Sequence, residues 1–487
     1  MRRLVVMAAT ALLLTACVGS AGTGKPVNPT SASPLPASEK LNVPDGFDNN
    51  HGRVFEEADR VFAFAPKAGA VVDVHDSHGE RDTIPPRGAT PTPSRRPSPA
   101  KSPDVPFVVG RSARTGAILW SSEPPGTLLD QDSPELHVVD TEAGEYVLLV
   151  RRGTTPESGR VRAQRVVSID AYPTTASGTG VRPTRHFERQ VEDNERDATV
   201  RIGDAGVLVS PATSTATPPP SVLWNPLTGA TTDVAAVTKA TATCPERTSP
   251  CQVTTRMLRP TRAGMLSQTT SDEVSSSSGR LCKDCVREFG ISGKWSSVNV
   301  APADQPMGIP LGTTSTALVA LWWKRDQDPL KGDPVLYTVH DLGTGTVITS
   351  VSCTAFPDLL NKTKELPLVP TTSPNKRYVA AGPLVADLSA GRAVCLGPDE
   401  KLKGVMFGTV TDRGLAYGTL EKSEFDSQLK NMPPLGATLD IATGRTDVLP
   451  DVVVAPVGPL VGGMALFRSP TAKTPQRVIL YPFVGDG

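Results

Sequence analysis

Short runs of apolar residues alternate with polar, glycine-ended turns along most of the chain. Strand-like residues precede such turns in segments 105–109, 222–224 and 335–339, and they follow them in segments 117–120, 346–351 and 392–396. Apolar runs of this length, bounded by turn residues, are typical of β-strands rather than helices. The pattern therefore predicts the all-β fold class, built from hairpins.

Five of the turns share one five-residue frame that begins with Asp, Asn or Ser and ends with Thr-Gly or Ala-Gly. They are Ser112–Gly116, Asn225–Gly229, Asp341–Gly345, Asp387–Gly391 and Asp440–Gly444. An Asp, Asn or Ser side chain in the first position can bond the backbone two residues on. The final glycine can adopt the positive φ that a type I turn with a G1 bulge requires. Each copy is predicted to be a hairpin between two strands.

The spacing of these turns suggests a repeat. The first two intervals between the glycines are each about twice the last two, as if one degenerate copy were skipped each time. Candidates for the skipped copies lie near Asp170 and at Gly293–Trp295, and segment 65–69 would continue the series towards the N-terminus. The repeat thus predicts seven or eight units of roughly 45 to 58 residues, the range of four-stranded propeller blades.

A closed ring of such blades leaves few exposed strand edges, which favours a β-propeller over the alternative of two stacked β-sandwiches. Segment 477–481, near the C-terminus, reads as a strand that completes the first or last blade. We expect a β-propeller of seven or eight four-stranded blades, with a disordered N-terminal tether.

A strand, a turn of the form Asp-x-x-Thr-Gly and a strand that ends in Trp together resemble the blade motif of the quinoprotein-alcohol-dehydrogenase-like (PQQ-like) propellers. Gly116–Trp120 is the best single match, and the resemblance covers most of residues 50 to 487. In that family a disulfide between adjacent cysteines, a stacking Trp and acidic calcium ligands accompany the quinone. This chain has no adjacent cysteines. The resemblance therefore implies the fold, and we expect no cofactor.

The N-terminus has the layout of a secretory signal: Arg2 and Arg3, an apolar run from Leu4 to Leu14, then small residues. The run is too short to cross a bilayer as a mature helix. Its end, Leu14–Cys17, resembles the bacterial lipobox, in which Cys17 becomes the acylated first residue. An ordinary signal peptide with an incidental cysteine is the alternative. Lipidation on Cys17 would place the protein on the extracytoplasmic face of the cell membrane.

The segment after Cys17 is rich in Gly, Ser, Pro and Thr and is predicted to remain a flexible tether. The domain prediction is a signal peptide at 1–16, a lipidated tether at 17–45 and a propeller at 46–487. Polar, Pro-rich stretches at 84–104, 211–220 and 268–279 are predicted to be surface insertions, and the first of them is predicted to be disordered.

The charge and the cysteine content limit which partners the protein is expected to bind and in which compartment it is expected to lie. The 50 basic and 50 acidic residues cancel, so nothing in the composition favours nucleic acid. Beyond Cys17 the chain has an even number of cysteines, which outside the cytoplasm implies disulfides. Short loops favour the pairs Cys244–Cys251 and Cys282–Cys285, which would leave Cys353–Cys395. For Cys282 and Cys285, a redox-active pair and half of a zinc site remain alternatives.

Motifs for catalysis are scarce. The sequence has no nucleophile elbow, Walker-type phosphate loop or dinucleotide fingerprint. His75 and His78, close to Asp73 and Asp82, could contribute metal ligands but read as a solvated turn, so no metal is predicted. Trp322 and Trp323 stand next to each other in an apolar strand, and both are predicted to pack in the core.

The sequence thus favours a non-catalytic propeller lipoprotein that presents a binding or scaffold surface. Its expected partners are the membrane, through the lipid anchor, and other envelope proteins or polymers. The alternative is a secreted enzyme or ligand sensor whose site lies in the central channel of the propeller, where loops from several blades converge.

Overall fold

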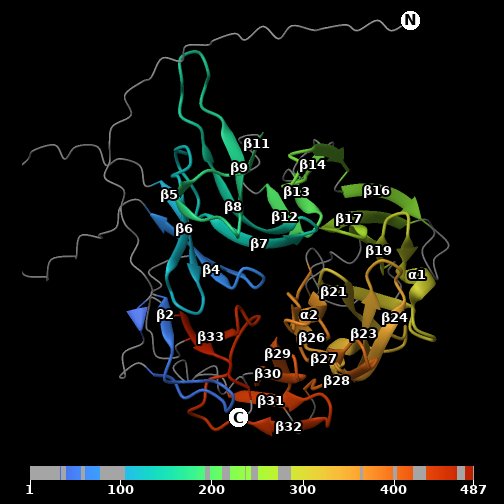
Figure 1. Cartoon of the computed structure of the whole chain (residues 1–487). Helices are drawn as coiled ribbons and strands as arrows, with labels where there is room; N and C mark the ends of the chain where they lie inside the picture. Colours follow the sequence, from blue (N-terminus) through green and yellow to red (C-terminus); the bar gives the residue numbers. More distant parts are fainter. Residues whose placement is uncertain are drawn as a thin grey trace, which may run out of the picture.

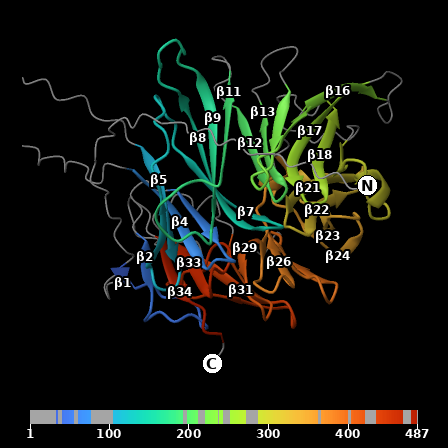
Figure 2. The same cartoon turned by 45° about the horizontal axis from the view of Figure 1, so that its top comes forward.

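The computed structural model describes residues 33–34, 40–55, 61–76, 105–191, 198–210, 220–235, 237–242, 251–271, 287–361, 366–398, 403–420, 435–468 and 478–485. These residues form eight sheets of four or five strands, which follow one another around a ring (Figures 1 and 2). The fold is an eight-bladed β-propeller. The predicted fold class and the upper predicted blade count are confirmed, and two stacked sandwiches are excluded.

We number the blades in chain order, beginning with the first complete one. Blade 1 contains β3 (Phe62–Ala65), β4 (Ala70–Asp76), β5 (Pro106–Ser112) and β6 (Ile118–Ser122), with β10 (Gly178–Val181) added to its edge. Blade 2 contains β7 (Glu135–Thr141), β8 (Gly144–Thr154), β9 (Arg165–Pro173) and β11 (Arg185–Gln190). Blade 3 contains β12 (Thr199–Gly203), β13 (Gly206–Ser210), β14 (Ser221–Trp224) and β15 (Thr231–Val234). Blade 4 contains β16 (Val237–Ala242), β17 (Cys251–Thr261), β18 (Gly264–Ser271), β19 (Arg287–Ile291) and β20 (Trp295–Ser296), and α1 (Ser297–Val300) follows it.

The second half of the ring is more regular. Blade 5 contains β21 (Met307–Thr313), β22 (Ala317–Trp323), β23 (Pro334–Asp341) and β24 (Val347–Thr354), with η3 (Pro329–Lys331) between β22 and β23. After α2 (Pro357–Asn361), blade 6 contains β25 (Thr371–Thr372), β26 (Tyr378–Ala381), β27 (Leu384–Asp387) and β28 (Arg392–Cys395). Blade 7 contains β29 (Val405–Val410), β30 (Leu415–Leu420), β31 (Gly436–Asp440) and β32 (Arg445–Val448). Blade 8 contains β33 (Met464–Arg468), β34 (Val478–Pro482), β2 (Arg53–Phe55) and β1 (Ser33–Pro34).

Blade 8 closes the ring with strands from both ends of the chain. The N-terminal β2 pairs antiparallel with the C-terminal β34, so that Val54 lies opposite Ile479. Figure 1 shows the blue β2 close to the red β33. Segment 478–482 is therefore a strand that completes the last blade, as the sequence predicted. Ordered contacts begin before residue 46: Leu41 and Val43 pack against blade 8, and the Leu41 N–H donates to the Tyr481 hydroxyl at 2.9 Å.

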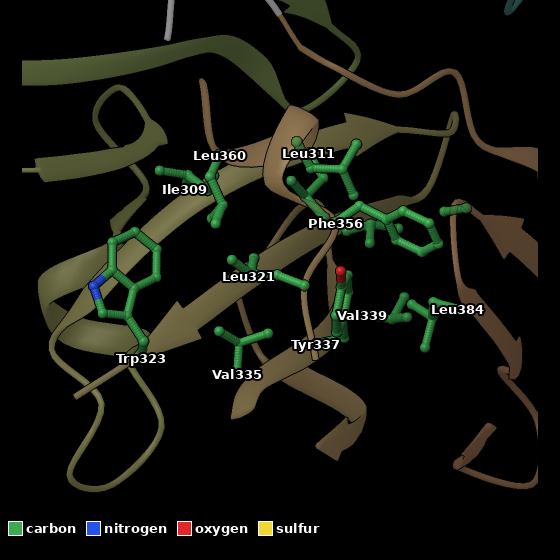
Figure 3. Close-up of a cluster of buried hydrophobic side chains, with 14 of the residues drawn as sticks. Ile309, Leu311, Leu321, Trp323, Val335, Tyr337, Val339, Phe356, Leu360 and Leu384 are labelled. Carbon is green, nitrogen blue, oxygen red and sulfur yellow. The ribbon is translucent and has the colours of Figure 1, made fainter. Parts of the chain in front are cut away.

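The core is divided among the interfaces between blades. In the part of the chain that the structure describes, seven hydrophobic clusters lie between neighbouring blades. Figure 3 shows the cluster between blades 5 and 6, where Tyr337 and Val339 of blade 5 lie on the side of Leu384 of blade 6. Each large apolar side chain buried in this way contributes roughly 1.5–3 kcal/mol. Adjacent blades thus hold each other in place.

Trp322 and Trp323 illustrate this division. They point to opposite faces of β22, as successive residues of a strand do. Trp322 packs in the cluster between blades 4 and 5, and Trp323 packs in the cluster between blades 5 and 6. Both are buried. The predicted packing role of this pair is confirmed.

Candidate functional site

The five glycine-ended turns each join the last two strands of a blade, in blades 1, 3, 5, 6 and 7. Their glycines, Gly116, Gly229, Gly345, Gly391 and Gly444, have φ between 62° and 76°. Asx-type hydrogen bonds hold the turns: Asn225 Oδ1 accepts from the Leu227 N–H at 2.8 Å, and Asp440 Oδ1 accepts from the Ala442 N–H at 2.9 Å. The geometry is the one that the hairpin interpretation requires.

The other three candidate repeat units occupy different positions within their blades. The Gly293 turn joins β19 to β20 and corresponds to the glycine-ended turns. Asp170 lies inside β9, and the connection that leaves β9 contains β10 instead of a tight turn. Segment 65–69 joins the first two strands of blade 1, so it belongs to the same blade as Gly116 rather than to a unit of its own.

The glycine-ended turns also join neighbouring blades. Arg185, the first residue of β11 in blade 2, donates from Nε to the Leu227 carbonyl in the turn of blade 3 at 3.2 Å. Trp295, the first residue of β20, donates from Nε1 to the Leu342 carbonyl in the turn of blade 5 at 3.0 Å. Arg392, the first residue of β28, donates to the Ala442 carbonyl in the turn of blade 7. The recurring turns are therefore part of the scaffold.

The two faces of the ring differ in construction. Because consecutive strands of a blade are antiparallel, the hairpins between the first two and the last two strands lie on one face. We call it the turn face, and most of its connections are tight. On the opposite face, the loop face, the second strand leads to the third and each blade leads to the next. Connections there include residues 77–105, 155–164, 211–220, 272–286 and 421–435.

Most of the internal stretches that lie outside the described residues belong to connections on the loop face. The predicted insertion at 84–104 and most of 211–220 are among them. Residues 268–271 of the predicted third insertion are instead the end of β18, since 268–270 pair with both β17 and β19 and Ser271 pairs with β17. Variable connections on a rigid frame are where binding residues usually lie. The loop face is therefore the candidate functional face.

Charged side chains meet on the turn face around Asp140, near the end of β7, the innermost strand of blade 2. Its Oδ1 lies 2.5 Å from Lys67 Nζ of blade 1 and 3.4 Å from an Arg262 guanidinium nitrogen of blade 4. Its Oδ2 lies 3.9 Å from Lys376 Nζ of blade 6. Blades 2 and 6 are four positions apart in a ring of eight, so this last contact joins opposite sides of the ring.

The loop-face end of β7 carries a second charged group. Glu135 lies 3.3 Å from His137 Nε2, and it forms an ion pair with Arg152 of the adjacent strand β8. The hydrogen bond from His137, helped by Arg152, lowers the pKa of Glu135 to about 2. The side chains of His137 and Glu135 are 40% and 42% exposed, so a ligand on the loop face could reach them.

The structure contains one of the three predicted cysteine pairs. A disulfide joins Cys353 of β24 to Cys395 of β28 and so links blades 5 and 6. Cys251 begins β17. Cys17, Cys244, Cys282 and Cys285 lie outside the described residues, so lipidation and the other two pairings stay predictions.

His75, one of the candidate metal ligands, is a buried residue of β4 rather than part of a solvated turn. Its Nε2 lies 2.7 Å from Asp73 Oδ2 and 3.1 Å from an Arg111 guanidinium nitrogen. His78 and Asp82 lie outside the described residues. Within the described residues, no three His, Cys, Asp or Glu side chains are placed to hold a metal ion, and no helix is long and apolar enough to cross a membrane.

The sheets define the class of the protein, an eight-bladed β-propeller. Most connections on its turn face are short, and the long connections lie mainly on its loop face. No protein-family model matches the chain, and no curated protein matches it. Among solved structures, the Dos1 propeller is 8% identical, with a TM-score of 0.30 over 74% of this chain and 96% of that one.

Two further solved structures are similar over most of their length. The rhamnogalacturonan lyase YesW is 11% identical, with a TM-score of 0.26 over 93% of this chain and 91% of that one. The Bombyx mori GH32 beta-fructofuranosidase BmSUC1 is 9% identical, with a TM-score of 0.21 over 91% of this chain and 93% of that one. The function is therefore argued from the residues of this chain.

Proposed function

We propose that the chain is an extracytoplasmic lipoprotein of the PQQ-like type, anchored through Cys17, whose propeller is a non-catalytic scaffold that binds envelope proteins or polymers. The observation that carries the proposal is the contrast between the two faces. The turn face consists mostly of short turns joined by hydrogen bonds and ion pairs, whereas the loop face holds most of the long connections. A rigid ring that gathers extended connections on one side is suited to binding.

The PQQ-like assignment is supported by the position of the turns. Four of the five lie before the outermost strand of their blade, and the Gly116 turn lies before β6, to whose edge β10 is added. Trp120 is buried between blades 1 and 2 directly after the Gly116 turn. The anchor is supported by the N-terminal sequence. The segment between Cys17 and β1 provides a tether at the edge of blade 8.

The anchor is tested by expressing the full chain in a bacterium fed an alkyne analogue of palmitate. We expect the wild type to take up the label and to fractionate with membranes. The Cys17→Ser variant should do neither, and its label should be lost without a change in the melting temperature of the folded part. Label that persists in this variant would remove the anchor from the proposal.

The binding face is tested by photo-crosslinking in intact cells. A photoreactive residue in place of Glu157, in the exposed β8–β9 connection of the loop face, should capture partners. The same residue in place of Thr443, in an exposed turn of the turn face, is the matched control and should capture few. Equal capture at both positions, or capture at the control alone, would contradict a loop-face scaffold.

A second candidate function, a ligand sensor or enzyme with its site at the channel, is favoured by one observation. Glu135 and His137 lie on the innermost strand of blade 2 with partly exposed side chains. A thermal-shift screen of small metabolites tests it. A compound that raises the melting temperature of the wild type but not of the His137→Ala variant would support this function, and a screen without such a compound would count against it.

A further inference from the structure

One interface of the ring is built differently from the other seven. The hydrophobic clusters of the described residues fill seven of the eight interfaces, and none of them spans blades 3 and 4. These two blades meet closely at their inner strands. A Cβ added to Gly203 of β12 would lie 1.7 Å from the Pro260 carbonyl oxygen of β17. The outer parts of the two blades lack a shared apolar core, and we call this interface the blade 3–4 gap.

The part of the surface that β18 and β19 present to this gap is polar, whereas the same face of β17 includes Val253 and Met257. Leu266, Phe289 and Ile291 pack against blade 5. The alternate residues of the same strands therefore point the other way, towards blade 3. Those residues align across the sheet, with Thr255 opposite Thr269, Thr269 opposite Glu288, and Ser267 opposite Gly290. The hydroxyls of Thr255 and Thr269 are 2.7 Å apart and hydrogen-bonded.

A pocket of about 340 Å³ lies at the outer strands of blade 4, and all of its lining residues belong to β18, β19, β20, α1 and the turn between β19 and β20. Its polar lining residues include Ser267, Thr269, Glu288, Lys294, Ser296 and Asn299. At this edge β20 has only two residues before the chain turns into α1. The volume falls in the range of small-ligand sites.

Two buried serine hydroxyls at the blade 3–4 gap, outside the lining of the pocket, lack partners among the described residues. Ser271 is 3% exposed, and it lies two residues beyond Thr269 on the same face of β18. Ser210 is 5% exposed and points towards blade 4, because Val207 and Val209 of its strand pack against blade 2. In the described part of the chain, neither Oγ has a hydrogen-bond partner. An unsatisfied buried polar group costs about 1–3 kcal/mol, so a ligand that bonds it gains affinity.

We infer that this pocket of blade 4 binds a neutral, polyhydroxylated ligand, one or two sugar units of a glycan. The wall offers hydroxyls that both donate and accept, a carboxylate that accepts, and an ammonium and an amide that donate. A sugar hydroxyl also both donates and accepts, so a ring with several hydroxyls can satisfy such a wall from several sides. The opposite charges of Glu288 and Lys294 favour a ligand without net charge. This inference does not depend on the lipid anchor.

The test uses the full mature chain with Cys17→Ser, which leaves out the lipid. A glycan array of bacterial and plant oligosaccharides identifies bound sugars, and calorimetric titration with the free sugar gives the dissociation constant. We expect binding that weakens tenfold or more in both Thr269→Val and Glu288→Gln. Thr269→Val keeps the side-chain shape and removes the hydroxyl, and Glu288→Gln removes the charge.

Matched controls make the same changes on other blades. Thr446→Val in the exposed β32 and Glu188→Gln in the exposed part of β11 should bind as the wild type does. The melting temperatures of all four variants should agree with each other, which shows that the ring is intact. Absence of binding to every sugar on the array would overturn the inference. Binding that survives both pocket substitutions would overturn it as well, because the site would lie elsewhere.

Discussion

The rings of Trp295 and His340 stack across the interface of blades 4 and 5, with centroids 6.5 Å apart and planes inclined by 7°. His340 is buried, with its Nδ1 2.8 Å from the Gly345 carbonyl oxygen and its Nε2 2.7 Å from the Thr338 hydroxyl. Trp295 donates to the Leu342 carbonyl of the same turn. One histidine and one tryptophan therefore fix the glycine-ended turn of blade 5 from both sides.

The burial of His340 predicts a pH dependence of stability. Burial lowers the pKa of His340 below its ordinary value of 6.5, and the hydrogen bond with the Gly345 carbonyl offsets this only in part. The unfolded chain therefore binds a proton more readily than the folded one, so the contribution of neutral His340 is present above about pH 6.5 and is lost as the pH falls. Chemical unfolding of wild type and His340→Gln between pH 7.5 and 5 measures the difference, which should shrink with falling pH.

Another histidine serves as the reference for that experiment. His186→Gln should act in the opposite direction, because the hydrogen bond with Asp170 raises the pKa of His186. Its contribution is present below about pH 6.5 and is lost as the pH rises through the folded pKa. A His340→Gln profile parallel to that of the wild type would contradict a buried neutral His340.

Gly345 predicts a stability cost with two separable parts. Alanine at this position would carry φ +76°, and its Cβ would lie 2.7 Å from the Trp295 ring. Gly293 has φ +74° and nothing within 4 Å of such a Cβ. Gly293→Ala therefore measures the backbone cost alone, about 1 kcal/mol. Gly345→Ala should lower the free energy of unfolding by about 1–3 kcal/mol more, because the ring must move. If the two substitutions lower the free energy of unfolding in denaturant equally, the Trp295 ring moves aside at no cost.

The disulfide between blades 5 and 6 predicts a loss of stability on reduction. Cys353 and Cys395 are 42 residues apart in sequence, so the bond closes a long loop in the unfolded chain. Replacing both with Ala should lower the free energy of unfolding by about 2–4 kcal/mol. Cys353→Ala alone should lower it by a similar amount. Calorimetry of both variants checks this, and an unchanged melting temperature would mean that the packing between these blades suffices without the bond.

The charges around Asp140 predict a salt-sensitive stabilisation across the ring. Lys67 and Lys376 are about half exposed, so each pair contributes less than about 1 kcal/mol. Asp140→Asn should therefore lower the free energy of unfolding by about 1 kcal/mol at low ionic strength and by less in about 1 M salt, where screening is strong. Asp447→Asn removes an exposed pair with Arg445 within one strand and is the control. Equal effects of the two substitutions would contradict a role for the contact across the ring.

The sequence predicts the fold well where the signal is local. A turn such as Asp341–Gly345 needs a capping side chain and a glycine with positive φ, and both requirements can be read from five residues. The signal fails in blade 2 for the same reason. There the chain after β9 adds β10 to blade 1 instead of closing a tight turn, so Asp170 marks a blade without marking a hairpin.

The charged and polar sites could not be predicted in this way, because they depend on which residues the closed ring brings together. Asp140 and Lys376 are far apart in sequence and lie on opposite blades. The polar surface around Thr269 is recognisable only once Leu266 and Phe289 are known to pack against blade 5. The sequence predicts residues 268–279 to be a polar insertion, so it misses the end of β18 as well as the side of that strand that lacks an apolar partner.

The pairing of β2 with β34 has a consequence for biogenesis. β2 pairs with β34, which is synthesised far later, so no polypeptide that ends before β34 can form the complete ring. If the chain crosses a membrane from its N-terminus onward, the ring can close only after residues near Val478 have emerged. A product truncated before that point would expose the edge of β2, which chaperones and proteases could recognise.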